Sequence, residues 1–296
     1  MTTSSGSLLI DKPVGLTSHD VVARLRALFN ERRIGHAGTL DPMATGLLVT
    51  AVGTSTRLLR FAQAQTKRYV GTVQLGVATD SLDADGTVVA TSPVPKMSLD
   101  EVTALASTME GPQTQVPPMV SALKVGGKRL HEMAREGLEI ERAPRNIIIY
   151  AFSLSPTDDD ARWDFDVTCS VGTYIRVLLS DLSEKMGTVG HLSALRRVAS
   201  GHHHVEDAYT LDQLSELDDV TSALEPPSSL VHDLESVELS SLDVAKMRMG
   251  QRVQLDRPFF GEEIAALDDS GALVGVLKRR GELWKPEIVM AQGETS

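Results

Sequence analysis

One carboxylate in the N-terminal part of the sequence has surroundings that suit chemistry. Asp41 lies in the run RRIGHAGTLDPMATGLLVTAVG, between Thr-Leu and Pro, with glycines on both sides and an apolar segment soon after. An Asp before a Pro often begins a turn, and for Asp41 alone that structural role is as good an interpretation as a chemical one. The glycines, the proline and the single acid together indicate a loop that presents this carboxylate.

Three further groups of polar and aromatic residues accompany Asp41. They are the GH pair that ends at His36, the KRY run at 67–69 and the GTYIR run at 172–176. Arg176 follows an apolar strand pattern and precedes an apolar helix pattern, and a buried arginine needs a carboxylate partner. An Asp paired with an Arg stays ionised and oriented, as a nucleophile or a base must be.

The elements that would position these residues alternate between strands and helices. Apolar periodicity, caps and turn residues distinguish them. The patterns predict strands at 6–12, 46–53, 146–155 and 162–169, a hairpin over 67–90, and helices at 17–30, 54–64, 98–111, 174–187 and 210–220. Strands in series mixed with helices predict an α+β domain with a mixed, mostly antiparallel sheet and flanking helices.

The end of the chain has a different pattern. Residues 225–240 have the composition of a linker, and the part that follows alternates and turns at DDSG and RRGE. Alternation with frequent turns predicts a small β-rich domain over about 240–292.

Composition bounds the class of protein. The chain has 296 residues, 42% of them hydrophobic and 23% charged, which is typical of a globular protein. The N-terminus has no basic region before an apolar one, and the sequence has no apolar stretch of the length that spans a bilayer, so neither a signal peptide nor a membrane span is expected. The single cysteine, Cys169, suits a packed strand position and the reducing cytoplasm, where we expect the protein.

The charge distribution leaves room for a nucleic acid partner. The net charge is −11, but residues 1–70 hold nine Lys and Arg against four Asp and Glu, while residues 201–240 hold ten acids and no Lys or Arg. Electrostatic fields act over about 8–10 Å in physiological salt. A basic face is therefore available near the N-terminus and around LKVGGKR at 123–129, and the acidic segment is expected to face away from RNA.

Three motifs that suggest ion or phosphate binding fail on inspection. The acidic turn with Asp80, Asp83 and Asp85 lacks the calcium-loop glutamate, because Ser92 stands at its twelfth position. GTLDPMATG lacks the Lys-Ser/Thr of a phosphate-binding loop. The tract at 202–204 is three consecutive histidines, and adjacent residues of a strand cannot all face one ion, so a solvated turn is favoured. No metal is expected.

The motifs in combination resemble the bacterial tRNA pseudouridine-55 synthases of the TruB family. The resemblance runs from about residue 6 to about residue 215, and is carried by LLIDKPVGLTSHDVV, RRIGHAGTLDPMATGLLV, TKRYVGTVQLGVATDSLDADG, VPPMVSALKVGGKRLHEMAREG and SVGTYIRVLLSDL with GTVGHLSALRRVASG. GHAGTLDPMATG together with KRY and GTYIR is far more specific than any one of them. The C-terminal part is similar to the small PUA-type RNA-binding domain that ends many such enzymes.

This resemblance implies an isomerase. Members of the family break the bond between ribose C1′ and uracil N1 and rejoin the ribose to C5, at the uridine in position 55 of the T-loop, without a cofactor. The uridine must first be flipped out of the RNA fold, which costs a few kcal/mol. Asp41 would be the catalytic residue; whether it attacks C1′, adds to C6 or acts as a base on the sugar stays open.

The resemblance also assigns roles around Asp41. Each role belongs to the pocket that would hold the flipped base. Tyr69 would stack on the uracil, Tyr174 would line the pocket, Arg176 would pair with Asp41, Leu195 would close the apolar wall, and His36 would approach the place that the nucleotide leaves. Stacking on an aromatic ring returns about 1–3 kcal/mol per base.

The implied partner is the T-arm stem-loop of tRNA, bound by a monomer. The first domain would cover residues 1–230, with a sheet of the pseudouridine synthase type and an RNA-gripping insertion at about 112–146 that contains a short helix near 130–137. The basic residues expected to contact RNA are Lys12, Lys67, Arg68, Lys124, Lys128 and Arg129.

Two other functions compete with this interpretation. An Asp-nucleophile hydrolase for phosphorylated small molecules would need an Asp-x-Asp pair and a metal, and Asp41 has no such neighbour. A non-catalytic RNA-binding or tRNA-folding module would keep the basic segments but would not need Asp41 or Arg176. One substitution, at Asp41, separates that module from the enzyme.

Overall fold

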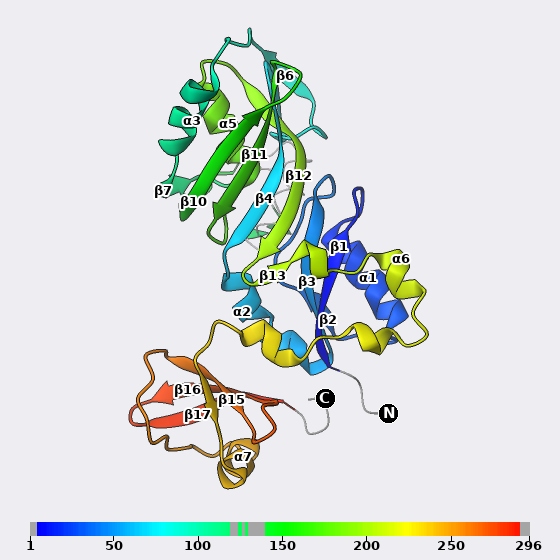
Figure 1. The fold of residues 1–296 in the computed structure, drawn as a ribbon, viewed down its shortest axis with the longest axis vertical. Helices are drawn as coiled ribbons and strands as arrows, with labels where there is room; N and C mark the ends of the chain where they lie inside the picture. The colour runs from blue at the N-terminus through cyan, green and yellow to red at the C-terminus, as the bar shows by residue number, and fades with distance from the viewer. Residues whose placement is uncertain (1–4, 119–123, 126–127, 130–139, 291–296) are drawn as a thin grey trace.

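One long sheet runs along the molecule (Figure 1). The computed structural model describes residues 5–118, 124–125, 128–129 and 140–290, and within them nine strands form this sheet. Its order is β1-β3-β12-β4-β11-β10-β7, with β2 paired to β3 and β13 to β12. The strands are β1 (Gly6–Lys12), β2 (Ile34–His36), β3 (Thr45–Val52), β4 (Lys67–Leu75), β7 (Gly111–Gln115), β10 (Arg145–Pro156), β11 (Arg162–Cys169), β12 (Gly190–Ser200) and β13 (His203–His204).

The pairing of β3 with β12 divides this sheet into two halves. It is parallel and only two residues long, Thr45 with Arg196 and Gly46 with Arg197, whereas the other pairs of the sheet are antiparallel. Gly46 has a φ of 97°, and a Cβ there would lie 2.3 Å from the carbonyl oxygen of Arg197. Only glycine allows the two backbones to approach this closely. The predicted α+β class with a mostly antiparallel sheet is confirmed.

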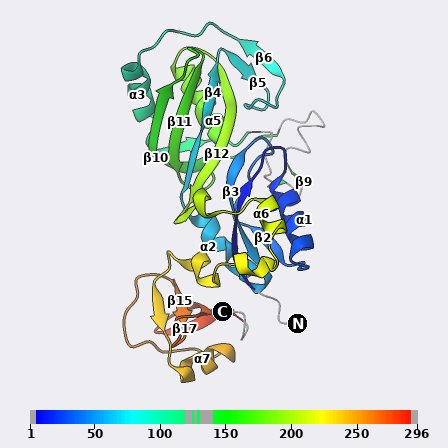
Figure 2. The same cartoon turned by 45° about the vertical axis from the view of Figure 1, so that its right-hand side comes forward.

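Helices cover the sheet, and two of them begin within one residue of the predicted start. Thr17 caps α1 and Ser98 caps α3, each with a complete capping box. Figure 2 shows α3 and α5 beside the strands of the β12-to-β7 half. The helices of this part are α1 (Ser18–Leu28), η1 (Gly53–Leu58), α2 (Leu59–Ala64), α3 (Leu99–Ser107), α5 (Ile175–Lys185), η2 (Val205–Asp207), α6 (Leu211–Ser215), η3 (Val220–Ala223) and η4 (Pro227–Val231), where η denotes a 3-10 helix.

The core follows the strand periodicity. In β11, alternate residues Trp163, Phe165, Val167 and Cys169 are buried and pack in the same cluster as the apolar faces of α3 and α5. Alternation places every second side chain on one face, which explains why a strand so rich in polar residues can be central. Cys169 is 1% exposed, as predicted, and burial raises the pKa of its thiol to about 11.

The predicted hairpin over 67–90 is only partly correct. β4 does not pair with its neighbour in sequence but lies between β11 and β12. The Asp-Gly turn instead joins two short strands, β5 (Val77–Thr79) and β6 (Val88–Thr91). Gly76, with a φ of 85°, separates β4 from β5. Long strands available elsewhere in the chain bury more of β4 than a local partner could, so tertiary pairing overrides the local pattern.

The predicted C-terminal β domain is present. It is a four-stranded sheet in the order β14-β15-β16-β17, with one helix beside it. Its elements are β14 (Ser236–Glu238), α7 (Ser241–Arg248), β15 (Glu263–Leu267), β16 (Leu273–Arg280) and β17 (Leu283–Val289). Figure 1 shows this sheet at one end of the elongated molecule.

Residues 225–240 form a packed segment and not a free linker. Leu230 and Val231, in η4, are buried in the cluster that also contains residues of β3 and of β15 to β17. Glu225 at its start exchanges backbone hydrogen bonds with Ser7 of β1. The composition of this segment is typical of linkers, but its few apolar side chains, among them Leu230 and Val231, are spaced so that they can be buried together.

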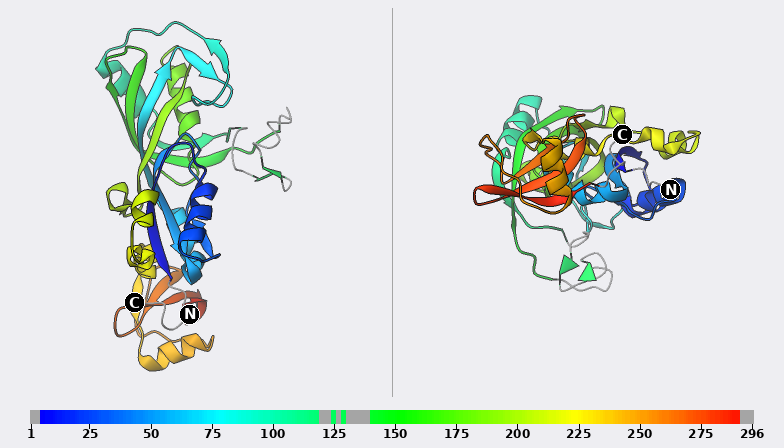
Figure 3. Two further views of the ribbon diagram at one scale, coloured as in Figure 1. Left: turned by 90° about the vertical axis from the view of Figure 1, so that its right-hand side faces the viewer. Right: turned by 90° about the horizontal axis from the view of Figure 1, so that it is seen from below.

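The predicted insertion begins and ends in the main sheet. β7 and β10 pair with each other at its two ends. Between them, the short strands β8 (Lys124–Val125) and β9 (Lys128–Arg129) form a two-stranded sheet of their own, beside the body of the molecule (Figure 3). The helix predicted near 130–137 lies outside the described residues. Among the described helices, none is long and apolar enough to cross a membrane.

Candidate active site

Five of the six residues predicted to form the pocket for the flipped base line one cavity, as does Lys67, which was predicted to contact RNA. The cavity has a volume of about 330 Å³ and is lined by the loop before β3, the starts of β4 and α5, and β12. Such a volume is at the lower end of the range of ligand pockets, about 300–1,000 Å³. The five residues come from segments far apart in the sequence: Asp41, Tyr69, Tyr174, Arg176 and Leu195.

The loop that carries Asp41 is fastened to the start of α1. The hydroxyl of Ser18 accepts a hydrogen bond from the Leu40 amide at 2.9 Å and donates to the Leu40 carbonyl at 3.2 Å. The Gly15 amide donates to the carbonyl of Pro42 at 2.8 Å. Because the backbone on both sides of Asp41 is held, its carboxylate is presented to the cavity in a fixed place.

Arg176 links Asp41 to a second carboxylate. Its guanidinium lies 3.1 Å from a carboxylate oxygen of Asp41 and 3.1 Å from one of Asp83, and it donates to the Ser81 carbonyl at 2.8 Å. The side chain of Arg176 is 4% exposed and that of Asp83 is 7% exposed, whereas that of Asp41 is 38% exposed. Asp83, from the acidic turn that does not fit a calcium loop, therefore completes this network.

Electrostatics make the Asp41 carboxylate unusually basic. Burial raises its pKa above the ordinary value, and the nearby charge of Asp83 adds to this, while Arg176 and Lys12 oppose the shift. A carboxylate with a raised pKa is a stronger proton acceptor, and the ion pair with Arg176 favours its ionised form. The site therefore combines a basic carboxylate with a fixed counter-ion.

The N-terminus of α5 positions Tyr174 and Arg176, the two residues of the GTYIR run that were predicted to belong to the site. Tyr174 is the N-cap, and its backbone is clamped by the amide side chain of Gln115: Tyr174 N–H donates to Oε1 at 2.7 Å, and Nε2 donates to the Tyr174 carbonyl at 3.0 Å. The clamp fixes the first turn of α5, from which Arg176 projects to the cavity.

Arg197 is a site residue that the sequence analysis missed. It lies on β12, is 1% exposed and lines the cavity. Its Nε donates to the Leu47 carbonyl at 2.7 Å and its Nη2 to the Gly38 carbonyl at 3.1 Å, and it lies opposite Tyr69 in the register of β12 and β4. The sequence feature that could have indicated Arg197 is the Arg-Arg pair in the apolar strand LSALRRVAS, because successive side chains of a strand point to opposite faces and one of the two must therefore point inward.

Two of the cations expected to contact RNA are buried instead. Lys12 is fully buried, and its ammonium donates to the carbonyls of Leu16 and Pro13. Lys67 is 5% exposed and donates to three carbonyls around the end of α2. Burial lowers the pKa of each to about 8. Both ammonium groups are engaged by the protein's own carbonyls and are not presented to a phosphate.

The other predicted residues lie outside the cavity lining. Arg68 is exposed and pairs with both carboxylate oxygens of Asp166, at 2.9 and 2.6 Å. His36 does not line the cavity. Its Nδ1 is buried and has no hydrogen-bond partner among the described residues, and burial, then the charge of Arg197, lowers the pKa of His36. The remaining three expected contacts lie in the β8–β9 hairpin: Lys124, Lys128 and Arg129.

Two family models match consecutive parts of the chain. The first, TruB family pseudouridylate synthase (N terminal domain), matches residues 26–175. The second, tRNA pseudouridylate synthase B C-terminal domain, matches residues 176–237. The boundary falls at Arg176, so the sheet that contains the cavity is built from both parts.

Similar proteins carry a consistent name. A protein of Streptococcus pneumoniae serotype 2 (strain D39 / NCTC 7466), named tRNA pseudouridine synthase B, is 41% identical to this chain; the match covers 97% of this chain and 100% of the relative. A protein of the same name from Opitutus terrae (strain DSM 11246 / JCM 15787 / PB90-1) is 47% identical, over 72% of this chain and 88% of the relative. The fold is similar to the crystal structure of a Cbf5-Nop10-Gar1 complex, with a TM-score of 0.73 and 25% identity over 96% of this chain and 84% of that one. From the two family models and these relatives, we conclude that the chain belongs to the TruB family of pseudouridine synthases.

Proposed function

We propose that this protein converts the uridine at position 55, in the T-loop of tRNA, to pseudouridine, and that Asp41 is the catalytic residue. The observation that carries the proposal is the ion pair of 3.1 Å between Asp41 and Arg176 in a cavity that Tyr69 and Tyr174 also line. The names of the relatives support tRNA as the substrate.

The cavity suits a flipped pyrimidine. Tyr69 supplies a ring on which the uracil stacks, and Leu195, 9% exposed, supplies an apolar wall. Arg197 lies opposite Tyr69 in the register of β12 and β4, so it occupies the same face of the sheet as that ring. Stacking returns part of the free energy needed to extrude the nucleotide.

The reaction is an isomerisation, so no co-reactant is consumed. The C1′–N1 bond breaks, a C1′–C5 bond forms, the C5 proton is released to water and N1 gains a proton. Asp41 serves by attack on C1′, by addition to C6 or as a base on the sugar, and each role requires the ionised carboxylate that Arg176 favours. No step calls for a cofactor.

RNA binding would involve surfaces beyond the cavity. We assign residues 1–230 to the catalytic domain and 240–292 to a PUA-like RNA-binding domain, with the insertion at about 112–146 gripping the T-arm stem-loop. Arg68 is 54% exposed on its side chain, and Lys124, Lys128 and Arg129 would add phosphate contacts. The protein would act as a monomer in the cytoplasm.

The test compares the wild type with Asp41→Ala on an unmodified tRNA transcript labelled with tritium at uracil C5. We expect the wild type to release tritium and the variant to bind the transcript without releasing any. Asp85→Asn is the matched control, because the side chain of Asp85 is exposed and does not line the cavity. This variant should release tritium at the wild-type rate. A wild type that binds the transcript but releases no tritium would replace this proposal with the non-catalytic RNA-binding module.

A further inference from the structure

A second cavity lies at the junction with the C-terminal sheet. Its volume is about 620 Å³, and none of its lining residues lines the Asp41 cavity. Its walls come from the turn between β12 and β13, from η4 and the residues after it, and from β15. It is therefore built by all three parts that meet at this end of the main sheet.

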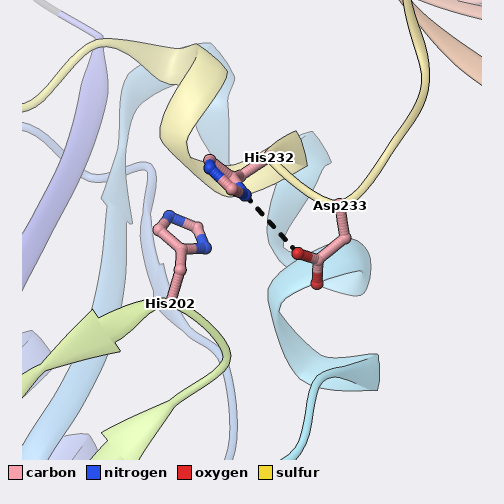
Figure 4. Close-up of side chains that lie close together, drawn as sticks. All are labelled: His202, His232 and Asp233. Atoms are coloured by element: carbon pink, nitrogen blue, oxygen red, sulfur yellow. Dashed lines mark ion pairs between the residues drawn. The ribbon is translucent and has the colours of Figure 1, made fainter.

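Three groups that commonly bind metals converge at this cavity. One ligand atom each of His202, His232 and Asp233 lies within 4.8 Å of the other two. Figure 4 shows His202, on the turn between β12 and β13, facing His232 and Asp233 at the end of η4. The two imidazole rings lie with centroids 4.1 Å apart, and His232 Nδ1 is 3.6 Å from a carboxylate oxygen of Asp233.

The surroundings keep these groups ready for a cation. Nδ1 of His202 is buried, and it has no hydrogen-bond partner among the described residues. A buried imidazole nitrogen without a partner is a cost to the protein unless something binds it.

Asp233 is oriented by a buried amide. Gln65, 6% exposed, donates from Nε2 to Oδ2 of Asp233 at 2.9 Å. Gly201 makes room for this amide, because a Cβ there would lie 2.2 Å from Gln65 Oε1. Carboxylates that bind metals are typically fixed in this way by a second hydrogen bond, which leaves the other oxygen for the ion.

We propose that His202, His232 and Asp233 bind one divalent transition-metal ion of the zinc class. Two imidazoles and a carboxylate suit zinc, whereas magnesium prefers oxygen ligands alone. Tetrahedral zinc places its ligand atoms about 3.3 Å apart, so the group must contract from its present spacing. The side chain of His232, which is 64% exposed, is free to make that rotation, while Gln65 keeps Asp233 in place.

The ion would act as a structural clip and not in the isomerisation. It would join the turn after β12 to the packed segment that leads into the C-terminal sheet, whose Ala265 and Leu267 line the same cavity. Only one residue of the histidine tract takes part: His203 is buried 4.0 Å from Glu225, and His204 is exposed. The partners of His202 come from 30 residues further along the chain, so the tract alone did not indicate them.

The test measures zinc binding by the full-length chain without an affinity tag, after removal of metals with a chelator. We expect about one zinc ion per chain in the presence of excess Mg²⁺, with a rise in Tm. His232→Ala and Asp233→Asn should each weaken zinc binding at least tenfold, and His204→Ala, next to His202 but outside the cluster, should bind zinc as the wild type does.

Three results would overturn the proposal: no zinc uptake by the wild type, equal affinity in His232→Ala, or the same loss in His204→Ala. Because the side chain of His232 is exposed, we expect its variant to fold as the wild type does, and the Tm of each variant without metal measures this directly. Tritium release by His232→Ala should equal that of the metal-free wild type, because the two cavities share no residue.

Discussion

At the scale of the residue, the central arrangement is one guanidinium between two carboxylates. Arg176 is almost fully buried, so both Asp41 and Asp83 serve to neutralise it. The exposed partner, Asp41, faces the cavity, and the buried partner, Asp83, stays inside the protein. This asymmetry leaves one carboxylate free to meet a substrate while the other keeps the arginine in place.

The arrangement predicts a pH dependence. Asp41 has a raised pKa, so the active, ionised form is lost as the pH falls through a value above that of an ordinary Asp. Asp83→Asn removes a negative neighbour and leaves Arg176 to Asp41, which lowers the pKa of Asp41. We expect the acid limb of kcat/KM to move to lower pH in this variant, measured by tritium release across the acid range. Movement of the limb to higher pH would contradict the role given to Asp83.

At the scale of the element, the register of β12 decides which arginine enters the site. Arg196 faces outward and forks onto Asp11 at 3.0 and 2.7 Å, whereas Arg197 faces inward. The long antiparallel pairing with β4 sets this register, and the short parallel contact with β3 brings the backbone of Arg197 against Gly46. The position of Arg197 therefore also depends on a glycine of another strand.

Gly46→Ala tests this dependence. Its Cβ would meet the Arg197 carbonyl at 2.3 Å, so β12 must move, and we expect a loss of tritium release together with reduced stability. Gly187→Ala is the control, because Gly187 also has a positive φ, 79°, but no described atom lies within 4 Å of its added Cβ. The free energy of unfolding of the control, measured in urea, should fall only by the cost of placing a residue with a Cβ in the left-handed conformation, about 1–2 kcal/mol. Equal effects of the two substitutions would show that the close approach is unimportant.

At the scale of the whole molecule, an apolar cluster joins the C-terminal sheet to the rest. Leu230 is fully buried in a cluster with Ile288 and Val276 of that sheet and Leu47 of β3. A surface ion pair also crosses the junction, between Arg60 and Glu263 at 2.8 Å. Burial of apolar surface, and not the ion pair, should contribute most of the free energy that holds the C-terminal sheet to the rest of the protein, because exposed ion pairs contribute about 0–1 kcal/mol.

This comparison is tested by two substitutions at the junction. Leu230→Ala leaves a cavity in the cluster and should lower the free energy of unfolding by about 2–5 kcal/mol. Arg60→Ala should lower it by about 0–1 kcal/mol. Urea unfolding of both variants measures the difference, and limited proteolysis at the junction should accelerate in Leu230→Ala alone. A larger effect for Arg60→Ala would reverse the ranking.

Much of the fold could be predicted from local patterns. The caps Thr17 and Ser98 and the alternation in β11 are properties of a few adjacent residues, and they hold wherever the segment is placed. The partner of β4 could not be predicted in this way. Strand pairing depends on competition among distant segments, and the adjacent hairpin lost that competition.

The sequence by itself determined the chemical content of the candidate site: Asp41 in its glycine-bounded loop, the tyrosines, and an arginine that needed an acid. Only the tertiary structure decided which charges are buried. Lys12 and Lys67 look like surface cations in the sequence but are enclosed by carbonyls, and Arg197 and His202 gain their partners from distant segments. The physical reason is that a charge and its spacing are local, whereas burial and pairing are set by the segments that fold around it.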